Sequence, residues 1–406
     1  MLRARLIAER SPLDPLPAPV PPRGRIAASI GSVALLVGTL FLLAGAGELA
    51  LRLVPGWSSD PALGRFNPYR PDGRTGYALR PGANVLHEEE EFSVPVRVNA
   101  LGQRGPERTA AKPPGVRRIL VLGDSFASGF GVREEEAFFS VLERLLSERG
   151  EHVEVLSAGV PGWSADNHLV FLRTVGFDLD PDVVLLAVCE NDLNDLAWNR
   201  LTLDDERLPV RVEATRRMID QRGRMRYVNE GRVALPSFAF PGQDWLADHS
   251  FLYHFLRFRL TKLEAALALR DDTPPFPAWL KADPERPLGE LSQGEIQLAL
   301  GASPDFRLRY HRHLVSAIAR ACAERGVEFR VLLVALRDGA RDRDPTLEAL
   351  HADCASEPAV CLDSAHVIAA NGTDPAAFFD HDPHWNARGH AQVGEALAAW
   401  LGAGAR

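Results

Sequence analysis

Four short segments carry the side chains that acyl transfer to a serine requires: GDS at 123–125, VPGWS at 160–164, ENDLND at 190–195 and DHDPH at 380–384. Such chemistry needs a nucleophile, a base, an acid that orients the base, and hydrogen-bond donors for an oxyanion. Ser125 and His384 are candidates for the first two roles, and Asp380 and Asp382 are candidates for the acid. The residue types therefore predict nucleophilic catalysis at Ser125.

The segment before Ser125 predicts where this serine lies. Ile119 to Leu122 is an apolar run that ends at Gly123, and such a run indicates a strand buried in a parallel sheet. Ligands bind at the carboxyl ends of such strands. The apolar spacing from Phe138 to Leu145 predicts a helix afterwards. The alternative is a tight turn that only caps this helix.

The rest of the chain continues this alternation. Predicted strands at 152–156, 183–188, 329–335 and 360–362 alternate with predicted helices that start after Ser164 or cover 306–325 and 387–401. We expect a three-layer α/β/α fold around a doubly wound parallel sheet. Residues 197–304 break the rhythm. They include an amphipathic piece at 252–269, and we interpret them as an insertion over the carboxyl edge of the sheet.

The strand ILVL followed by GDS resembles block one of the SGNH hydrolases, also called GDSL esterases or lipases. The later segments resemble the further blocks in family order, over about 113–405. The resemblance implies an esterase with a flavodoxin-like fold and no cofactor. It implies an oxyanion hole made by the N–H groups of Ser125 and Gly162 and by the Asn191 amide. Without the resemblance, Gly162 and Asn191 are turn residues, and Cys189 replaces a usual glycine of block three.

The last block departs from the commoner Asp-x-x-His form, because His381 stands three residues before His384. The DPHW at 382–385 resembles an Asp-x-His variant, found in the branch related to alginate and cell-wall O-acetylation proteins. The resemblance thus implies Ser125, His384 and Asp382 as a catalytic triad, with Asp380 as the second choice for the acid.

A metal cluster is the alternative use of this last segment. It would combine the carboxylates and imidazoles of Asp380, His381, Asp382, His384 and His390. These are possible zinc ligands, but no spacing signature fixes a site. We therefore expect no metal.

Composition limits the classes of protein to consider. The 406 residues are 46% apolar and 25% charged, which is typical of a globular chain. The net charge of −8 excludes a nucleic-acid partner.

Cys354 and Cys361 lie close in a loop-like stretch, so outside the cytoplasm we expect a disulfide between them, with Cys189 and Cys322 reduced and buried. The alternative is four free thiols.

An uncharged stretch from Ile26 to Gly47 is long enough to span a bilayer, so we expect a transmembrane helix at 26–50. Arginines are more frequent before it than after it, which places the tail at 1–25 in the cytoplasm and the main domain outside. A cleaved signal peptide ending near Ala44 to Ala46 is the alternative.

Residues 51–112 are interpreted as a small β-rich stalk with a strand at 91–98 and a solvated acidic run at 87–91. The leading hypothesis is a membrane-anchored esterase that acts on an acylated carbohydrate or lipid of the envelope. The alternatives are an O-acetyltransferase of an extracytoplasmic polysaccharide and an inactive carbohydrate-binding module.

Overall fold

The computed structural model describes residues 23–53, 68–214, 217–219, 225–227, 250, 252–253, 256, 276–334, 336–337, 345–368 and 374–402. The first helix, α1 (Arg23–Leu53), covers the predicted span. Its stretch Gly31–Leu51 has a mean hydropathy of 2.0 and is long and apolar enough to cross a membrane, a property that signal sequences share. Residues 1–22 of the predicted tail and most of the amphipathic piece at 252–269 lie outside the described residues, and the last three residues predicted for the tail begin α1.

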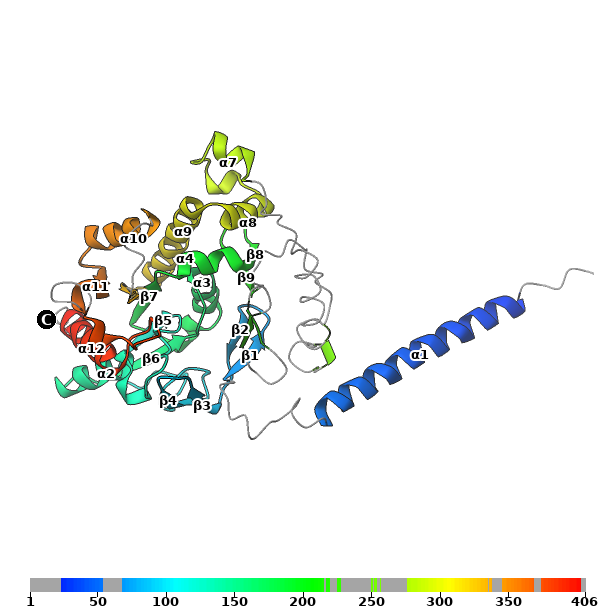
Figure 1. The fold of residues 1–406 in the computed structure, drawn as a ribbon, viewed down its shortest axis with the longest axis horizontal. Coiled ribbons are helices and arrows are strands. Elements are labelled where there is room, and N and C mark those ends of the chain that lie inside the picture. The colour runs from blue at the N-terminus through cyan, green and yellow to red at the C-terminus, as the bar shows by residue number, and fades with distance from the viewer. Residues whose placement is uncertain are drawn as a thin grey trace, which may run out of the picture.

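A five-stranded parallel sheet forms the centre of the main domain (Figure 1). Its strands are β5 (Arg117–Gly123), β6 (Val153–Gly159), β7 (Val183–Cys189), β12 (Glu328–Val334) and β13 (Cys361–Asp363). Their spatial order is β13-β12-β7-β5-β6. This is the flavodoxin-like order, in which the winding direction reverses between the first and third strands. In such sheets ligands bind at the carboxyl ends of the strands on either side of the reversal, which here are β5 and β7.

Helices cover both faces of this sheet. Successive strand residues point to opposite faces, so an apolar strand supplies side chains to the helices on both sides. Ile119 and Val121 pack toward α2 (Phe138–Glu148) and α12 (Ala387–Gly402). Leu120 and Leu122 pack toward α3 (Ala165–Thr174) and α9 (Pro304–Ala323). All four side chains are fully buried, so the predicted three-layer α/β/α architecture is confirmed.

The second strand is longer than predicted. The predicted strand ends at residue 156, but residues 157–159 still pair with Val121 to Gly123 of β5. Small side chains make this extension possible, since a Cβ on Gly159 would lie 2.3 Å from the backbone nitrogen of Ser128. The end of β6 therefore passes directly under the turn that carries Ser125.

Residues 68–104 form two antiparallel hairpins beside the main domain: β1 (Tyr69–Asp72) with β2 (Gly76–Leu79), and β3 (Asn84–Glu88) with β4 (Ser93–Arg97). The first hairpin is hydrogen-bonded to the loop after β6. Trp163 Nε1 donates to Tyr77 O at 3.0 Å, and Tyr77 Oη donates to Pro161 O at 2.9 Å. His87, expected on a solvated surface, is buried because it packs against Phe92 and Phe130.

The segment after β7 contributes short elements, several of which pack against α3 and α9. They are α4 (Asp192–Asp195), β8 (Asn199–Leu203) paired with β9 (Pro209–Ala214), β10 (Arg217–Ile219) paired with β11 (Met225–Tyr227), α7 (Ala278–Ala282) and α8 (Gln293–Ala302). Ser292 and Ser303 cap α8 and α9, respectively, by accepting hydrogen bonds from backbone N–H groups.

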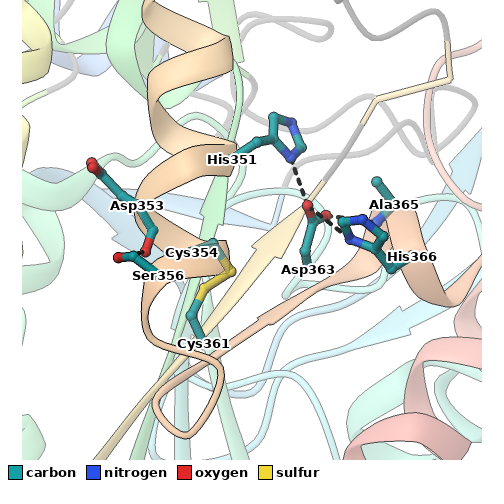
Figure 2. The surroundings of a disulfide bond; sticks show 8 residues. All are labelled: His351, Asp353, Cys354, Ser356, Cys361, Asp363, Ala365 and His366. Atoms are coloured by element: carbon teal, nitrogen blue, oxygen red, sulfur yellow. Dashed lines mark hydrogen bonds and ion pairs between the residues drawn. A yellow bond between two sulfur atoms is a disulfide. The ribbon is translucent and has the colours of Figure 1, made fainter.

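The predicted disulfide is confirmed. Cys354 of α10 (Pro345–Ser356) is bonded to Cys361 of β13, while Cys189 and Cys322 are free and buried. Figure 2 shows a second link between the same two elements, in which His351 Nδ1 lies 2.7 Å from Asp363 Oδ2. His366 of α11 (Ser364–Val367) contacts the same carboxylate at 3.3 Å.

Candidate active site

Ser125 lies in a tight turn at the carboxyl end of β5, where the sequence placed it. The carboxylate of Asp124 forms this turn by accepting a hydrogen bond from the Phe126 N–H at 3.0 Å. Gly123 is required there, because a Cβ would lie 2.6 Å from the Cβ of Ala127. A long turn follows, and helix α2 begins only at Phe138. Ser125 therefore does not lead directly into a helix, and within the turn its hydroxyl donates to Asp124 Oδ2 at 3.3 Å.

The loop before α12 brings a histidine to this hydroxyl. His384 Nε2 lies 2.7 Å from Ser125 Oγ. Asn386 anchors the loop to the helix, since its side-chain oxygen accepts from the N–H groups of Arg388 and Gly389 at 2.9 and 3.3 Å. The serine is 8% exposed, so the pair is accessible without being fully solvated.

The structure brings Asp382, and not Asp380, to this histidine. Asp382 Oδ1 lies 2.5 Å from His384 Nδ1 and also accepts from the His384 backbone N–H at 2.9 Å. Burial raises the pKa of Asp382, but the hydrogen bonds and charge of His384 outweigh it, so the net shift is downward. Asp382 is thus an anionic acceptor, which fixes the tautomer that leaves Nε2 toward Ser125.

The two other predicted oxyanion residues lie in adjacent loops. Gly162 follows β6 and has φ of +79°, in the left-handed region that favours glycine. The Val160 N–H donates to Gly123 O at 3.0 Å, which connects this loop to the turn that carries Ser125. Asn191 follows β7, and its Nδ2 donates to Asp195 Oδ2 at 3.2 Å. Its amide also lowers the pKa of Asp124, although burial is the larger effect and raises that pKa overall.

Cys189 lies at the end of β7. Its side chain is fully buried among the residues that pack under the Ser125 turn. Burial raises the pKa of its thiol well above the ordinary value. Cys189 is therefore a packing residue of the core under this turn.

Two phenyl rings that none of the sequence motifs indicated contact the imidazole of His384. Phe126 lies 4.6 Å from it between ring centres, and Phe130 lies 4.2 Å from it at an interplanar angle of 23°. The only signal in the sequence is their spacing of four residues directly after Ser125. Both rings limit the rotation of the imidazole and shield it from water.

The residues of the alternative metal cluster do not converge. His384 faces Ser125, while the Nδ1 of His390 accepts from the Phe138 N–H at 3.3 Å on the buried side of α12. Asp380 and His381 are exposed. Over the described residues, no group of three or more His, Cys, Asp or Glu side chains is arranged to hold a metal.

The known proteins that are similar to this chain include several esterases. No protein-family model matches the chain. An arylesterase from Vibrio mimicus is 33% identical over 75 residues, which are 18% of this chain and 38% of the arylesterase. The match thus spans less than two fifths of that relative.

Several solved structures are similar to the chain at low identity. A protein assigned to the lipolytic G-D-S-L family from Desulfitobacterium hafniense is 11% identical, covers 70% of this chain and 99% of its own, and has a TM-score of 0.35. The esterase EstA from Pseudoalteromonas is 10% identical, with 71% and 97% covered and a TM-score of 0.36. The acetyl xylan esterase AlAXEase is 13% identical, with 70% and 98% covered and a TM-score of 0.34. These scores are low, so the fold rests on the strand order itself.

Proposed function

We propose that this chain is an SGNH-type serine hydrolase that cleaves ester bonds with Ser125 as nucleophile, His384 as base and Asp382 as the acid that orients it. The hydrogen-bonded series from Ser125 Oγ through His384 to Asp382, with distances of 2.7 and 2.5 Å, is the observation that carries this proposal. The 2.7 Å between Ser125 Oγ and His384 Nε2 lies within the reach required of a nucleophile and its base, and the base is in turn oriented by a third group, Asp382.

The proposed reaction has two stages. Ser125 Oγ attacks the ester carbonyl while His384 Nε2 takes its proton, and the alcohol leaves with that proton as the C–O bond breaks. Water then attacks the acyl-enzyme, His384 again takes a proton, and the acid is released as Ser125 recovers its hydrogen. The backbone N–H groups of Ser125 and Gly162 and the Asn191 amide would stabilise the oxyanion. For this, the Asn191 amide has to turn an N–H from the carboxylates of Asp124 and Asp195 toward the substrate.

We further propose an acylated carbohydrate or lipid of the cell envelope as substrate. The apolar α1 would anchor the enzyme with residues 1–25 in the cytoplasm, because the arginines cluster before the span. Residues 113–405 would then act outside the cytoplasm, where the Cys354–Cys361 disulfide persists. The acetyl xylan esterase among the similar structures suggests an acetylated sugar as the first substrate to assay.

The experiment that tests this proposal is hydrolysis by the full-length chain in detergent. We expect release of acetate from p-nitrophenyl acetate and from an acetylated xylo-oligosaccharide. Lack of turnover of both esters by the wild type, together with an unmodified Ser125 after treatment with a fluorophosphonate, would reject the proposal.

Transfer to a sugar is a second candidate function, favoured by the Asp-Pro-His form of the last block. An O-acetyltransferase would use the same acyl-enzyme, but a sugar hydroxyl would replace water in the second stage. Adding a non-acetylated oligosaccharide to the ester assay distinguishes the two. Accumulation of acetylated oligosaccharide in place of acetate would identify a transferase.

A further inference from the structure

We propose that Glu91, in the connection between β3 and β4, is a positioning residue that holds the loop bearing Asp382 and His384. This inference rests on the proposed function and extends the active site to residues outside the catalytic blocks. It assigns the hairpins formed by β1 to β4 a role in positioning the catalytic residues.

Both oxygens of the Glu91 carboxylate accept hydrogen bonds from backbone N–H groups of that loop. Oε1 accepts from the Asp380 N–H at 2.5 Å, and Oε2 accepts from the His381 N–H at 2.9 Å. The partners are separated by 289 and 290 residues along the chain. Hydrogen bonds to an ionised acceptor are about twice as strong as neutral ones, so this contact ties the hairpin firmly to the loop.

Arg337, which follows β12, holds the same stretch by its carbonyl groups. Its Nη1 donates to Phe379 O at 2.5 Å and also to Asp380 O. A carboxylate and a guanidinium thus bind consecutive peptide groups of the loop from the N–H side and from the C=O side. Asp380 and His381 have exposed side chains, so burial does not fix this stretch and these backbone contacts take its place.

Aromatic side chains connect Phe92, which follows Glu91 in the chain, to the imidazole of His384. Phe92 lies 5.2 Å from Phe379 and 5.5 Å from Phe130 between ring centres. His87 meets Phe130 edge-on at 4.6 Å, and Phe130 stacks on His384. Burial lowers the pKa of His87 to about 3, so this histidine stays neutral beside the active site.

The segment following β4 supports the nucleophile in the same way. The guanidinium of Arg104, only 3% exposed, donates to the carbonyls of Ser128, Gly129 and Val132 in the turn after Ser125. The N-terminal segment therefore contacts the loops of both the nucleophile and the base. Since a misplacement of about 1 Å can lower a rate about 100-fold, these contacts set how well Ser125 and His384 meet.

The test compares Glu91→Ala and Glu91→Gln with Glu90→Ala, an exposed neighbouring glutamate, in the full-length chain. We expect Glu91→Ala to lower kcat for p-nitrophenyl acetate about 10- to 100-fold with KM nearly unchanged, because the loop orients the base and does not bind substrate. Glu91→Gln keeps one acceptor oxygen and should fall between the wild type and Glu91→Ala. Glu90→Ala should match the wild type.

Amide hydrogen exchange of the peptide spanning 378–384 gives a readout that does not depend on activity. Exchange at Asp380 and His381 should rise at least tenfold in Glu91→Ala and stay at the wild-type rate in Glu90→Ala. Unchanged exchange would overturn the contact itself, even if the wild type cleaves no ester. Faster exchange with wild-type kcat would overturn the positioning role while leaving the proposed hydrolase intact.

Discussion

Ser125 Oγ lies 2.7 Å from Nε2 of His384, although 259 residues separate them in the chain. The serine comes from the end of the central strand β5, and the histidine comes from the loop before the last helix, α12. The sheet order places the ends of β5 and β7 at the switch point. The packing of α12 against α2 on one face of the sheet brings the histidine loop to that point.

Replacing Asp382 should separate the roles of the two aspartates in the last block. Asn at 382 presents an amide in place of an anionic acceptor to His384 Nδ1 and no longer enforces its tautomer. We expect Asp382→Asn to lower kcat for p-nitrophenyl acetate by orders of magnitude, toward the ~10⁴-fold loss of the comparable change in a serine protease.

Asp380→Asn is the matched control, because Asp380 takes part in the loop through its backbone N–H and C=O. Its kcat should stay within a few-fold of the wild type. If the two losses came out reversed, Asp380 would be the orienting acid. Equal and small losses would mean that a backbone group orients His384.

Much of this site could be predicted because each block lies at a local boundary. The apolar run before Gly123 defines a buried strand, and the Asp-Pro-His segment precedes an amphipathic helix. Residues of this kind are recognisable from neighbours a few positions away. Cys354 and Cys361 were predicted to pair for the same reason, since only a short loop separates them.

The contacts that hold the site could not be predicted, because they join segments far apart in the chain. Glu91 reads as part of an acidic surface run, and only the fold shows its carboxylate on the loop of His384. The predicted length of β6 was too short, because the small residues Ser157 to Gly159 are typical of a turn. In the fold their small side chains allow close packing under the turn that carries Ser125. Arg104 gave no signal, since arginines are mostly exposed.

Removing the disulfide should lower stability without abolishing the fold. For the short loop that Cys354 and Cys361 close, the chain-entropy relation gives about 2 kcal/mol. We expect the double variant Cys354→Ser/Cys361→Ser to lose about this free energy of unfolding in urea. Dithiothreitol should destabilise the wild type similarly and leave the double variant unaffected. Equal sensitivity of the two proteins to reduction would contradict the assignment.

Alkaline pH should weaken the contact between α10 and the sheet. His351 lies between Asp363, 2.7 Å away, and Glu190, 3.2 Å away. Their hydrogen bonds raise the pKa of His351 to about 9, although burial opposes this. Its folded pKa lies above the unfolded value of about 6.5, so the stabilisation is complete below pH 6.5 and disappears as the pH rises through 9.

Urea unfolding between pH 6 and 10 measures this effect. The wild type should lose stability over that interval, and His351→Gln should start less stable and show a smaller decline. Parallel curves for the two proteins would contradict the charged bridge.

Membrane topology can be tested with reporters fused after Arg406. The arginines before the apolar span of α1 predict that the carboxyl end lies outside the cytoplasm. A reporter that works only outside should be active there, and one that works only in the cytoplasm should be silent. The reverse pattern would show that the orientation is wrong.

The most direct test of the central claim compares the wild type with Ser125→Ala in full-length protein. The smaller side chain fits the turn, so the melting temperature should stay close to that of the wild type. Turnover of p-nitrophenyl acetate should fall to the background rate, and a fluorophosphonate should modify the wild type at Ser125 and leave the variant unmodified. Wild-type turnover by the Ser125→Ala variant would contradict the serine mechanism.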